Sequence, residues 1–412
     1  MLKARAGPIQ QHMFGGKTLD YSIRNTYTGD MAKETEHLEE LRQHCLAAGM
    51  GEKMTSIYIR HLGEEKAEDY PAGYMEWCHE NGFLAAHAIG LGINPGNSAE
   101  FFSDFDYYRV FPLNNWMRMW VNDKLTLKYM LHGTPWQNVM PEYYFYSTPH
   151  GLRKLVDNPY DDQTAETVLR LVREHGKIAC KPNNGSCSVG FCKLEYSRQT
   201  GSYLMNSSPC TEEELVHFIN TTPNVIYTEY LTPCPELARI HPKIHTIRVI
   251  VINEHGNDPK IAGGYVRFPV NKLGEANYLS ARQMGDYTFY TELDLRTGQM
   301  FRPSAVYLNK VEAMPTHPDT GYTMREGEPI PHWDELVETA LGISRHLFGL
   351  EFIGFDLCVA EGGVKLMEIN THPGCNGIQW SHHVFDKTEL VRYLRKRLAE
   401  KDALLAGTQG NA

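Results

Sequence analysis

The amino-acid sequence predicts an α+β fold with largely antiparallel sheets. Apolar runs of strand length follow one another closely in the second half of the chain, as in "HTIRVIVI" and "IAGGYVRF", with turn residues between them. Helical patterns occur among these runs without alternating with them one for one, which disfavours a uniform succession of βαβ units. A chain of 412 residues is also too long for one small core, so we expect two or three packed units.

Composition and charge exclude several classes of function. The net charge of -10 leaves no broad basic surface for phosphate backbones, so we expect no nucleic-acid partner. No apolar run reaches the roughly 20 residues of a membrane span, and the first residues lack the apolar core of a secretory signal. We therefore expect no membrane insertion. Nine cysteines without a CxxC pair are typical of a reducing compartment, and we place the protein in the cytoplasm.

Capping residues mark several of the expected helices. Asn122 and Asp123 provide an N-cap for a short helix over 124–131, and Gly176 ends a helix over 165–175. Thr211 and Glu214 have the spacing of a capping box ahead of an apolar run. The remaining predictions are a helix over 333–348 and strands over 177–182, 189–195 and 224–231.

The stretch "KPNNGSCSVGF" sets one lysine before a loop of small and amide residues. Gly185 and Gly190 allow the backbone to bend and to approach a ligand closely. Ser186, Ser188 and the loop N–H groups can donate to anionic oxygens, and Lys181 supplies a point charge. These features indicate a phosphate-binding loop. A surface hairpin with a solvated lysine is the alternative.

The stretch "GFDLCVAEGGVKLMEIN" predicts a metal site on a β-hairpin. If residues 361–363 form a three-residue loop, counting outward places Asp356 directly opposite Glu368, and alternation adds Asn370 to the same face. Opposed carboxylates about 5 Å apart repel by about 3 kcal/mol at an effective dielectric of about 20, and a divalent cation removes that repulsion. These oxygen ligands suit Mg²⁺, and Mn²⁺ is a second candidate. The alternatives are a solvated polar face, or a two-residue loop whose register separates the two acids.

Two arginines lie in apolar strand-like runs. Arg248 interrupts "TIRVIVI", and a charge in a buried strand requires a partner. That partner could be a substrate or, alternatively, a carboxylate in the core. Arg267 lies in "YVRFPV", which ends at a proline and could equally be exposed.

With these motifs in this order, residues 119–380 resemble the ATP-grasp superfamily. "NDKLTLKYML" is similar to its lysine-containing opening segment, and "KPNNGSCSVGF" is similar to its phosphate loop. "VIYTEYL" resembles the hinge strand that meets adenine, and the hairpin motif resembles the metal site. "LARIHPKIHTIRVIVI" followed by "GGYVRF" resembles the sugar-transfer-associated branch, whose members are linked to polysaccharide biosynthesis.

The resemblance implies an ATP-grasp fold, in which two α/β lobes with antiparallel sheets enclose ATP. We expect an N-terminal α/β domain of uncertain type over 1–115, a first lobe over 116–230, a second lobe over 231–400 and a flexible tail over 401–412.

The resemblance also implies roles for individual residues. The expected phosphate contacts are Lys124 and Lys181, joined by Ser186 and Ser188 of the loop, and the expected adenine and ribose contacts are Glu229, Tyr230 and Leu231. The expected Mg²⁺ ligands are Asp356, Glu368 and Asn370, and the residues expected to face the γ-phosphate or the reacting carboxylate are Arg248 and Arg267.

These roles lead us to expect an ATP- and Mg²⁺-dependent carboxylate–amine ligase acting on small molecules. The carboxylate would become an acyl phosphate, an amine would capture it as an amide, and ADP and phosphate would leave. A kinase on the same fold and a non-catalytic nucleotide-binding module are the alternatives. The sequence leaves the identity of both substrates and the oligomeric state open.

Overall fold

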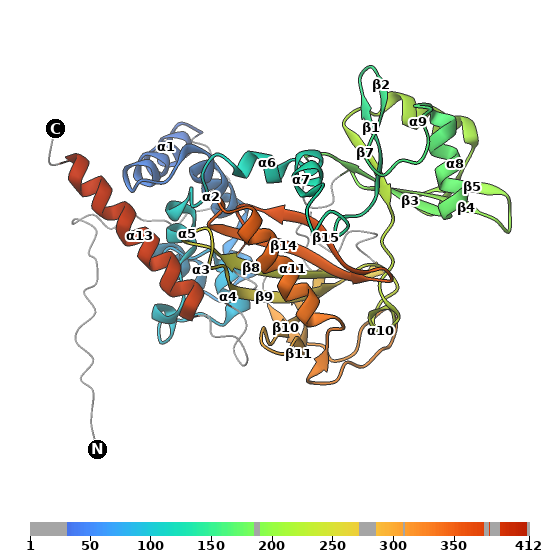
Figure 1. The fold of residues 1–412 in the computed structure, drawn as a ribbon. Coiled ribbons are helices and arrows are strands. Elements are labelled where there is room, and N and C mark those ends of the chain that lie inside the picture. Colours follow the sequence, from blue (N-terminus) through green and yellow to red (C-terminus); the bar gives the residue numbers. More distant parts are fainter. Residues whose placement is uncertain are drawn as a thin grey trace.

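The structure is a computed structural model, and it describes residues 31–184, 190–271, 286–307, 310–374, 379 and 388–409. Within these residues the chain forms two antiparallel sheets with helices packed around them (Figure 1). The α+β class with antiparallel sheets is therefore confirmed. No described helix is both long enough and apolar enough to cross a membrane.

The first sheet contains the strands of residues 143–229, in the order β2-β1-β7-β3-β4-β5-β6. Its strands are β1 (Tyr143–Thr148), β2 (Gly151–Lys154), β3 (Lys177–Pro182), β4 (Cys192–Ser197), β5 (Ser202–Met205), β6 (Ser208–Cys210) and β7 (Val225–Glu229). Helices α8 (Ala165–His175) and α9 (Glu212–Thr221) cover one face of this sheet. Ile178 and Cys180 of β3 pack into that covered face, so the alternation of the strand turns Lys181 toward the opposite one.

The predicted helix caps are present in the first half of the chain. The Asp123 carboxylate accepts a hydrogen bond of 2.8 Å from the Thr126 N–H at the start of α7. Thr211 and Glu214 form the predicted capping box of α9, with bonds of 3.1 Å and 2.8 Å in the two directions. These local predictions are confirmed because capping depends on a few neighbouring residues only.

The second sheet has the order β12-β11-β10-β9-β8-β14-β15, and β13 pairs with β11. Its strands are β8 (Thr246–Ile252), β9 (Lys260–Phe268), β10 (Tyr287–Leu293), β11 (Gln299–Tyr307), β12 (Val311–Ala313), β13 (Glu328–Pro329), β14 (Phe352–Ala360) and β15 (Gly363–Asn370). The helices that accompany this half are α6 (Arg118–Asn122), α7 (Lys124–Leu131), α10 (Pro235–Ala238), α11 (Trp333–His346) and α13 (Thr388–Gln409). Residues 401–409, expected to lie in a flexible tail, continue α13.

The described part of the N-terminal region, residues 31–115, consists of helices and contains no strand. Its α-helices are α1 (Met31–Ala47), α2 (Glu52–Glu64), α3 (Tyr74–Glu80), α4 (Ala85–Leu91) and α5 (Asp104–Val110). The α/β domain expected there is corrected to a helical one in this part. Its apolar residues recur at helical spacing, as Met54, Tyr58 and Leu62 do on α2, where all three are buried.

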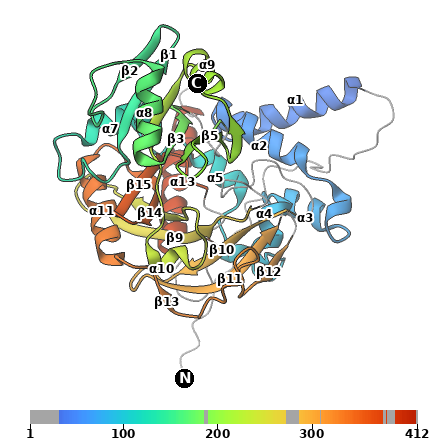
Figure 2. The same cartoon turned by 90° about the vertical axis from the view of Figure 1, so that its right-hand side faces the viewer.

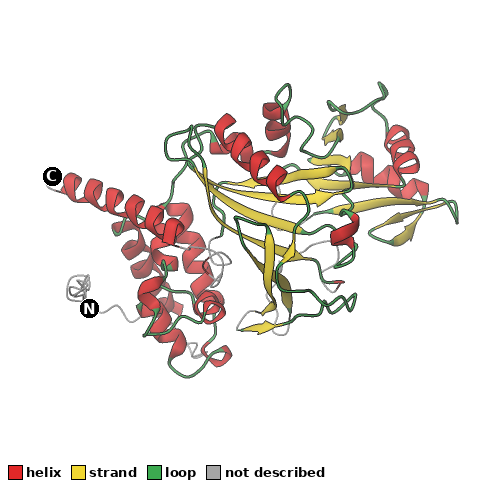
Figure 3. Cartoon of the chain, turned by 60° about the horizontal axis from the view of Figure 1, so that its bottom comes forward, coloured by secondary structure: helices red, strands yellow, loops and turns green. Residues whose placement is uncertain are grey.

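The N-terminal helices and α13 pack against one face of the second sheet (Figures 2 and 3). Ile250 and Ile252 of β8 contribute to this contact, whereas Ile247 and Val249 point to the other face and share a core with α11. Arg248 follows the same alternation as Ile250 and Ile252. The face that carries Arg248 therefore continues directly into the contact with the N-terminal helices.

Candidate functional site

The turn between β14 and β15 is one residue shorter than expected. Ala360 pairs with Gly363, so the turn consists of residues 361–362 and not of residues 361–363. Gly363 has a φ of 97°, a left-handed conformation that glycine adopts without strain, and it can therefore close the shorter turn. The predicted three-residue loop is wrong.

A β-bulge nevertheless brings the two acids together. Leu357 pairs with Leu366, whereas the next pair is Asp356 with Glu368, so Met367 is the extra residue of β15. A bulge inserts one unpaired residue into a strand and shifts the register by one. This shift offsets the short turn, and Asp356 lies directly opposite Glu368 as predicted.

The three expected metal ligands converge on one face of the hairpin. The Asn370 side-chain amide donates to Asp356 Oδ2 and to Glu368 Oε1, each at 3.4 Å. Burial and the nearby Asp356 carboxylate raise the pKa of Glu368. Burial alone would also raise the pKa of Asp356, but the Arg248 guanidinium keeps it below its ordinary value. In the absence of a cation, Glu368 is therefore the carboxyl group that takes up a proton more readily.

Arg248 forms a buried ion pair with Asp356. Its Nη2 donates to Asp356 Oδ2 at 3.0 Å, and its Nε makes a shorter contact with Oδ1. Asp356 thus has both a cationic partner from β8 and the position expected of a metal ligand. Oδ2 also accepts from the Asn370 amide, whereas Oδ1 keeps a second acceptor site, so this ion pair leaves Asp356 able to bind a cation as well.

Consecutive cross-strand partners extend this group along one row of the sheet. Glu368, Asp356, Arg248 and Tyr265 are neighbours in that order on β15, β14, β8 and β9. Arg267 follows Tyr265 by two residues and is also buried, with 5% of its surface exposed. The structure thus resolves the question of its exposure and brings both arginines to the face of the metal candidates. Tyr265 was not anticipated, although its alternation with Arg267 in "GGYVRF" is the signal that could have identified it.

Lys124 and Lys181 approach this group from the first part of the chain. Lys124 Nζ lies 3.7 Å from Glu368 Oε2, which joins the start of α7 to β15. Burial and the nearby charge of Lys124 lower the pKa of Lys181 to about 8, and Lys128 contributes in the same direction. The structure therefore collects lysine side chains from α7 and β3 near Glu368 of β15.

Asn183 connects the start of α7, where Lys124 lies, to the start of the predicted phosphate loop. Its side-chain oxygen accepts from the Leu125 N–H at 3.0 Å, and its amide donates to Asp123 Oδ2 at 2.5 Å. Asn183 was not among the predicted site residues. Ser186 and Ser188 lie outside the described residues.

The predicted adenine residues lie where the first sheet meets the second. Glu229 ends β7, and its Oε2 accepts from the Glu142 N–H at 3.2 Å and lies 3.8 Å from Lys365 Nζ. The Tyr230 ring lies beneath Lys177 Nζ, 4.5 Å from its centroid. Leu231 packs with Cys358 and Ala360 of β14 and with the partly buried Met367 and Ile244. This apolar cluster beside a hydrogen-bonding strand end is suited to a flat heterocycle.

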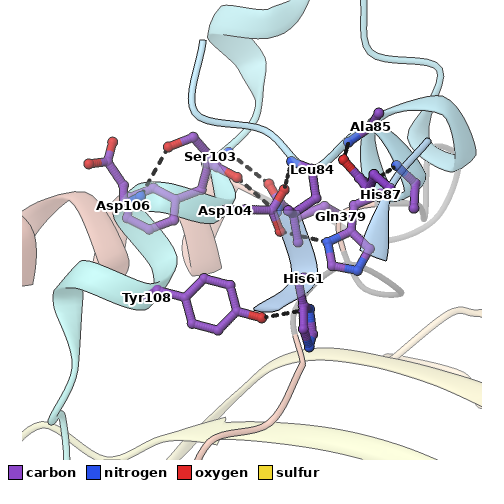
Figure 4. Close-up of polar contacts among 12 residues, drawn as sticks. His61, Leu84, Ala85, His87, Ser103, Asp104, Asp106, Tyr108 and Gln379 are labelled. Atoms are coloured by element: carbon purple, nitrogen blue, oxygen red, sulfur yellow. Dashed lines mark hydrogen bonds and ion pairs between the residues drawn. The ribbon is translucent and has the colours of Figure 1, made fainter. Parts of the chain in front are cut away.

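The N-terminal helices border the site on the side of the segment that follows Asn370. Tyr107 of α5 donates a hydrogen bond to the Pro373 carbonyl, and Phe111 packs on His372 with ring centroids 4.7 Å apart. The buried Asp104 carboxylate joins α5 to the start of α4. It accepts from the Leu84 N–H at 2.8 Å and contacts His87 Nδ1 at 2.6 Å (Figure 4). The N-terminal region is therefore part of the surroundings of the site.

The donor set fits a hard divalent cation. In the described part of the chain, no cluster of three or more His, Cys, Asp and Glu side chains could hold a metal ion. Asp356 and Glu368 instead offer two carboxylates, and Asn370, whose amide nitrogen faces them here, adds its oxygen once the amide group turns over. Magnesium is typically bound by one or two carboxylates together with waters and phosphate oxygens, so this incomplete set suits a nucleotide-bound Mg²⁺.

Comparisons with known proteins give one family and several distant structures. A profile of the sugar-transfer associated ATP-grasp family matches residues 117–389. No curated protein gives a significant match. Similar solved structures include the ATP-grasp ligase PsnB complexed with a minimal precursor, at 14% identity and a TM-score of 0.35, covering 69% of this chain and 63% of PsnB.

Two further similar structures are enzymes from bacteria. D-alanyl-alanine synthetase A from Vibrio cholerae is 13% identical with a TM-score of 0.38, covering 68% of this chain and 66% of that one. D-alanine–D-alanine ligase from Bacillus anthracis is 14% identical with a TM-score of 0.35, covering 72% of both chains. The chain thus spans less than two thirds of the length of PsnB and of the Vibrio enzyme. The family match covers well over half of the chain, and the chain therefore belongs to the sugar-transfer-associated ATP-grasp family.

Proposed function

We propose that the protein is an ATP- and Mg²⁺-dependent carboxylate–amine ligase. The observation that carries this proposal is the convergence of Asp356, Glu368 and Asn370 on one face of the hairpin, with Lys124 reaching to 3.7 Å from Glu368. Oxygen ligands for a cation thus lie beside lysines suited to phosphates. Phosphoryl transfer depends mainly on positioning and charge neutralisation, and this group supplies both.

The proposed reaction has two steps. An oxygen of the substrate carboxylate attacks the γ-phosphorus of ATP, the bond to the β–γ bridging oxygen breaks, and ADP leaves. The nitrogen of an amine then attacks the acyl carbon, the bond from that carbon to the phosphate oxygen breaks, and the nitrogen loses a proton. The products are an amide, ADP and phosphate. No nucleophilic side chain of the protein is needed.

The residues have distinct parts in this proposal. Lys181 and Lys124 hold the β- and γ-phosphates, while Arg248 and Arg267 face the γ-phosphate or the substrate carboxylate. The ligands of the cation are Asp356, Glu368 and Asn370. When bound, Mg²⁺ neutralises charge on the phosphate oxygens, and Mn²⁺ could use the same ligands.

The remaining nucleotide contacts come from the loop and from the end of β7. We assign Ser186 and Ser188 to the phosphates, and Glu229, Tyr230 and Leu231 to the adenine and ribose. We place the reaction in the cytoplasm, with small-molecule carboxylate and amine substrates, in polysaccharide or specialised-metabolite biosynthesis.

An assay with pooled substrates tests the proposal. The protein is incubated with ATP, Mg²⁺ and mixed carboxylates and amines, while ADP, free phosphate and product masses are followed. We expect ADP and phosphate in equal amounts, together with an adduct lighter than the sum of the two substrates by one water. Omission of the amines should suppress adduct formation.

Two other outcomes would overturn the assignment as a ligase. A phosphorylated product without free phosphate identifies a kinase that transfers the γ-phosphoryl group to a hydroxyl. Tight ATP binding without any ADP identifies a non-catalytic nucleotide-binding module. Each outcome keeps the ATP site and replaces only the chemistry assigned to it.

A further inference from the structure

Tyr143 carries a buried hydroxyl group that has no partner among the described residues. Its side chain is fully buried at the start of β1, and its oxygen accepts and donates no hydrogen bond there. Leaving a buried polar group unpaired is destabilising, and nearly all such groups in native proteins are satisfied. The unpaired Tyr143 hydroxyl therefore requires an explanation, and one explanation is that a bound ligand supplies its hydrogen-bond partner.

The surroundings of Tyr143 belong to the proposed phosphate site. Lys181 Nζ and Lys128 Nζ each lie 5.3 Å from the centre of its ring. The charge of Glu368 raises the pKa of the phenol, after the larger effect of burial, which places the ring near the acid that Lys124 also approaches. Tyr143 thus packs in the apolar core close to Lys181, a phosphate-binding candidate, and near enough to Glu368, a metal-ligand candidate, to feel its charge.

The two neighbouring lysines differ in how they are already engaged. Lys128 Nζ donates to the Pro141 carbonyl at 3.0 Å and pairs with Asp157 at 2.7 Å, so its hydrogen-bonding capacity is largely used within the protein. Lys181 makes no ion pair within 4.0 Å with any described carboxylate. A negatively charged ligand bound by Lys181 would therefore lie close to the Tyr143 ring, over which this ammonium group is placed.

We propose that Tyr143 is a nucleotide-positioning residue whose hydroxyl donates a hydrogen bond to a phosphate oxygen of bound ATP. This inference rests on the proposed ATP site. The direction of the bond follows from chemistry, because phosphate oxygens only accept hydrogen bonds and the buried phenol remains protonated at neutral pH. A neutral donor also orients the phosphate without adding a further charge to the cluster of Lys124, Lys128 and Lys181.

Tyr227 provides a matched control on the neighbouring strand β7. Its hydroxyl is also buried without a partner among the described residues. Its ring, however, packs in the core beneath α8 and α9, beside Cys180 and on the other face of the first sheet. Tyr143→Phe and Tyr227→Phe therefore remove equivalent groups, of which only the first lies on the face of the sheet that carries Lys181.

The experiment measures nucleotide binding and stability of wild type, Tyr143→Phe and Tyr227→Phe by calorimetric titration and thermal unfolding. Titrations use ATP with Mg²⁺, and adenosine as a ligand without phosphates. We expect both variants to be at least as stable as the wild type without nucleotide. Tyr143→Phe should bind ATP roughly ten-fold more weakly or worse, because a hydrogen bond to a charged group is lost, and should bind adenosine unchanged. Tyr227→Phe should bind both ligands like the wild type.

Three results would overturn the inference. Wild-type ATP affinity in Tyr143→Phe would show that the hydroxyl makes no phosphate contact. Equal weakening of ATP and adenosine would point to a general distortion of the site. A wild-type protein that binds no ATP would remove both this inference and the proposed function, and the wild-type titration distinguishes that failure from the first two.

Discussion

Asp356 lies directly opposite Glu368 because two irregularities of the hairpin compensate each other. With the two-residue turn alone, regular pairing would continue to the end of β14 and place Asp356 opposite Met367. The bulge at Met367 moves Glu368 into that position instead. The apposition of two acids that repel each other is therefore built into the backbone, as expected where a cation compensates the repulsion.

Glu368→Gln should abolish turnover while leaving the fold intact. The amide keeps the shape of the side chain and removes the negative charge that a divalent cation requires. Loss of a residue that only orients a metal ligand typically costs 10–100-fold, so loss of the ligand itself should lower kcat by at least about 100-fold. Release of ADP at saturating Mg²⁺ measures the effect. Glu361→Gln, in the exposed turn of the same hairpin, is the control and should behave like the wild type. Wild-type turnover in Glu368→Gln would remove the metal assignment.

Asp356→Asn should differ from Glu368→Gln by destabilising the protein. Asp356 is the buried partner of Arg248, and removing one member of a buried ion pair leaves an uncompensated charge. Such a loss lowers the free energy of unfolding by about 3–5 kcal/mol. Denaturant unfolding of the two variants measures the difference directly.

The double variant Arg248→Met/Asp356→Leu is the control for that measurement. It removes both charges, so it should recover most of the stability that Asp356→Asn loses, although it should remain inactive. If Asp356→Asn proves as stable as Glu368→Gln, the ion pair does not stabilise the second sheet.

The affinity for ATP should fall as the pH rises above about 8. Burial and the neighbouring lysines lower the pKa of Lys181 to about 8 in the free protein, so this side chain loses its charge above that pH. Phosphate binds the charged form of Lys181, so above pH 8 the lysine must take up a proton when ATP binds. The dissociation constant should therefore rise by up to ten-fold per pH unit above 8 and be nearly constant just below it. Titrations from pH 7 to 9.5 test this, and a flat profile would contradict it.

Two variants at position 181 separate charge from other effects. Lys181→Arg keeps its charge throughout and should give a flat profile. Lys181→Met provides the reference for stability. Because the folded pKa lies below that of the unfolded chain, the unfolded state binds more protons above pH 8. The wild type should therefore gain stability relative to Lys181→Met as the pH rises from 8 to 9.5, while its ATP affinity falls.

Local chemistry made much of the site predictable from the sequence. The capping box of Thr211 and Glu214 involves four consecutive residues, and the convergence of Asp356, Glu368 and Asn370 follows from strand alternation once the register is known. The order of the motifs along the chain predicted the family that the profile match confirms. The roles of the individual residues stay predictions.

The features that the sequence did not predict depend on tertiary packing. A bulge at Met367 has no local signal in the sequence. The pairing of Asp356 with Glu368 was predicted correctly, but from a three-residue turn that does not form. The partner of Arg248 lies on a strand more than 100 residues away. The helices over 31–115 were unclear because their buried faces are completed by the second sheet and by α13, so their own apolar stripes are short.

Gly354→Ala should damage the site through packing alone. Gly354 pairs with Asn370, and a Cβ atom there would lie 2.6 Å from Pro373 Cβ and 3.4 Å from Arg248 Cδ. The added methyl group must push apart the segment after the metal ligands and the arginine that pairs with Asp356. Overpacking of this kind costs about 1–3 kcal/mol, and denaturant unfolding should show that loss.

Gly362→Ala is the matched control in the same hairpin. Its added Cβ would have no heavy atom nearer than 3.9 Å, so its stability and turnover should stay close to those of the wild type. Gly354→Ala should lose turnover in addition to stability, because Arg248 and Asn370 both move when Pro373 is displaced. If both variants retain wild-type turnover, the close approach of Pro373 to β14 does not position these two residues, and the alignment of the site must depend on the Arg248–Asp356 ion pair instead.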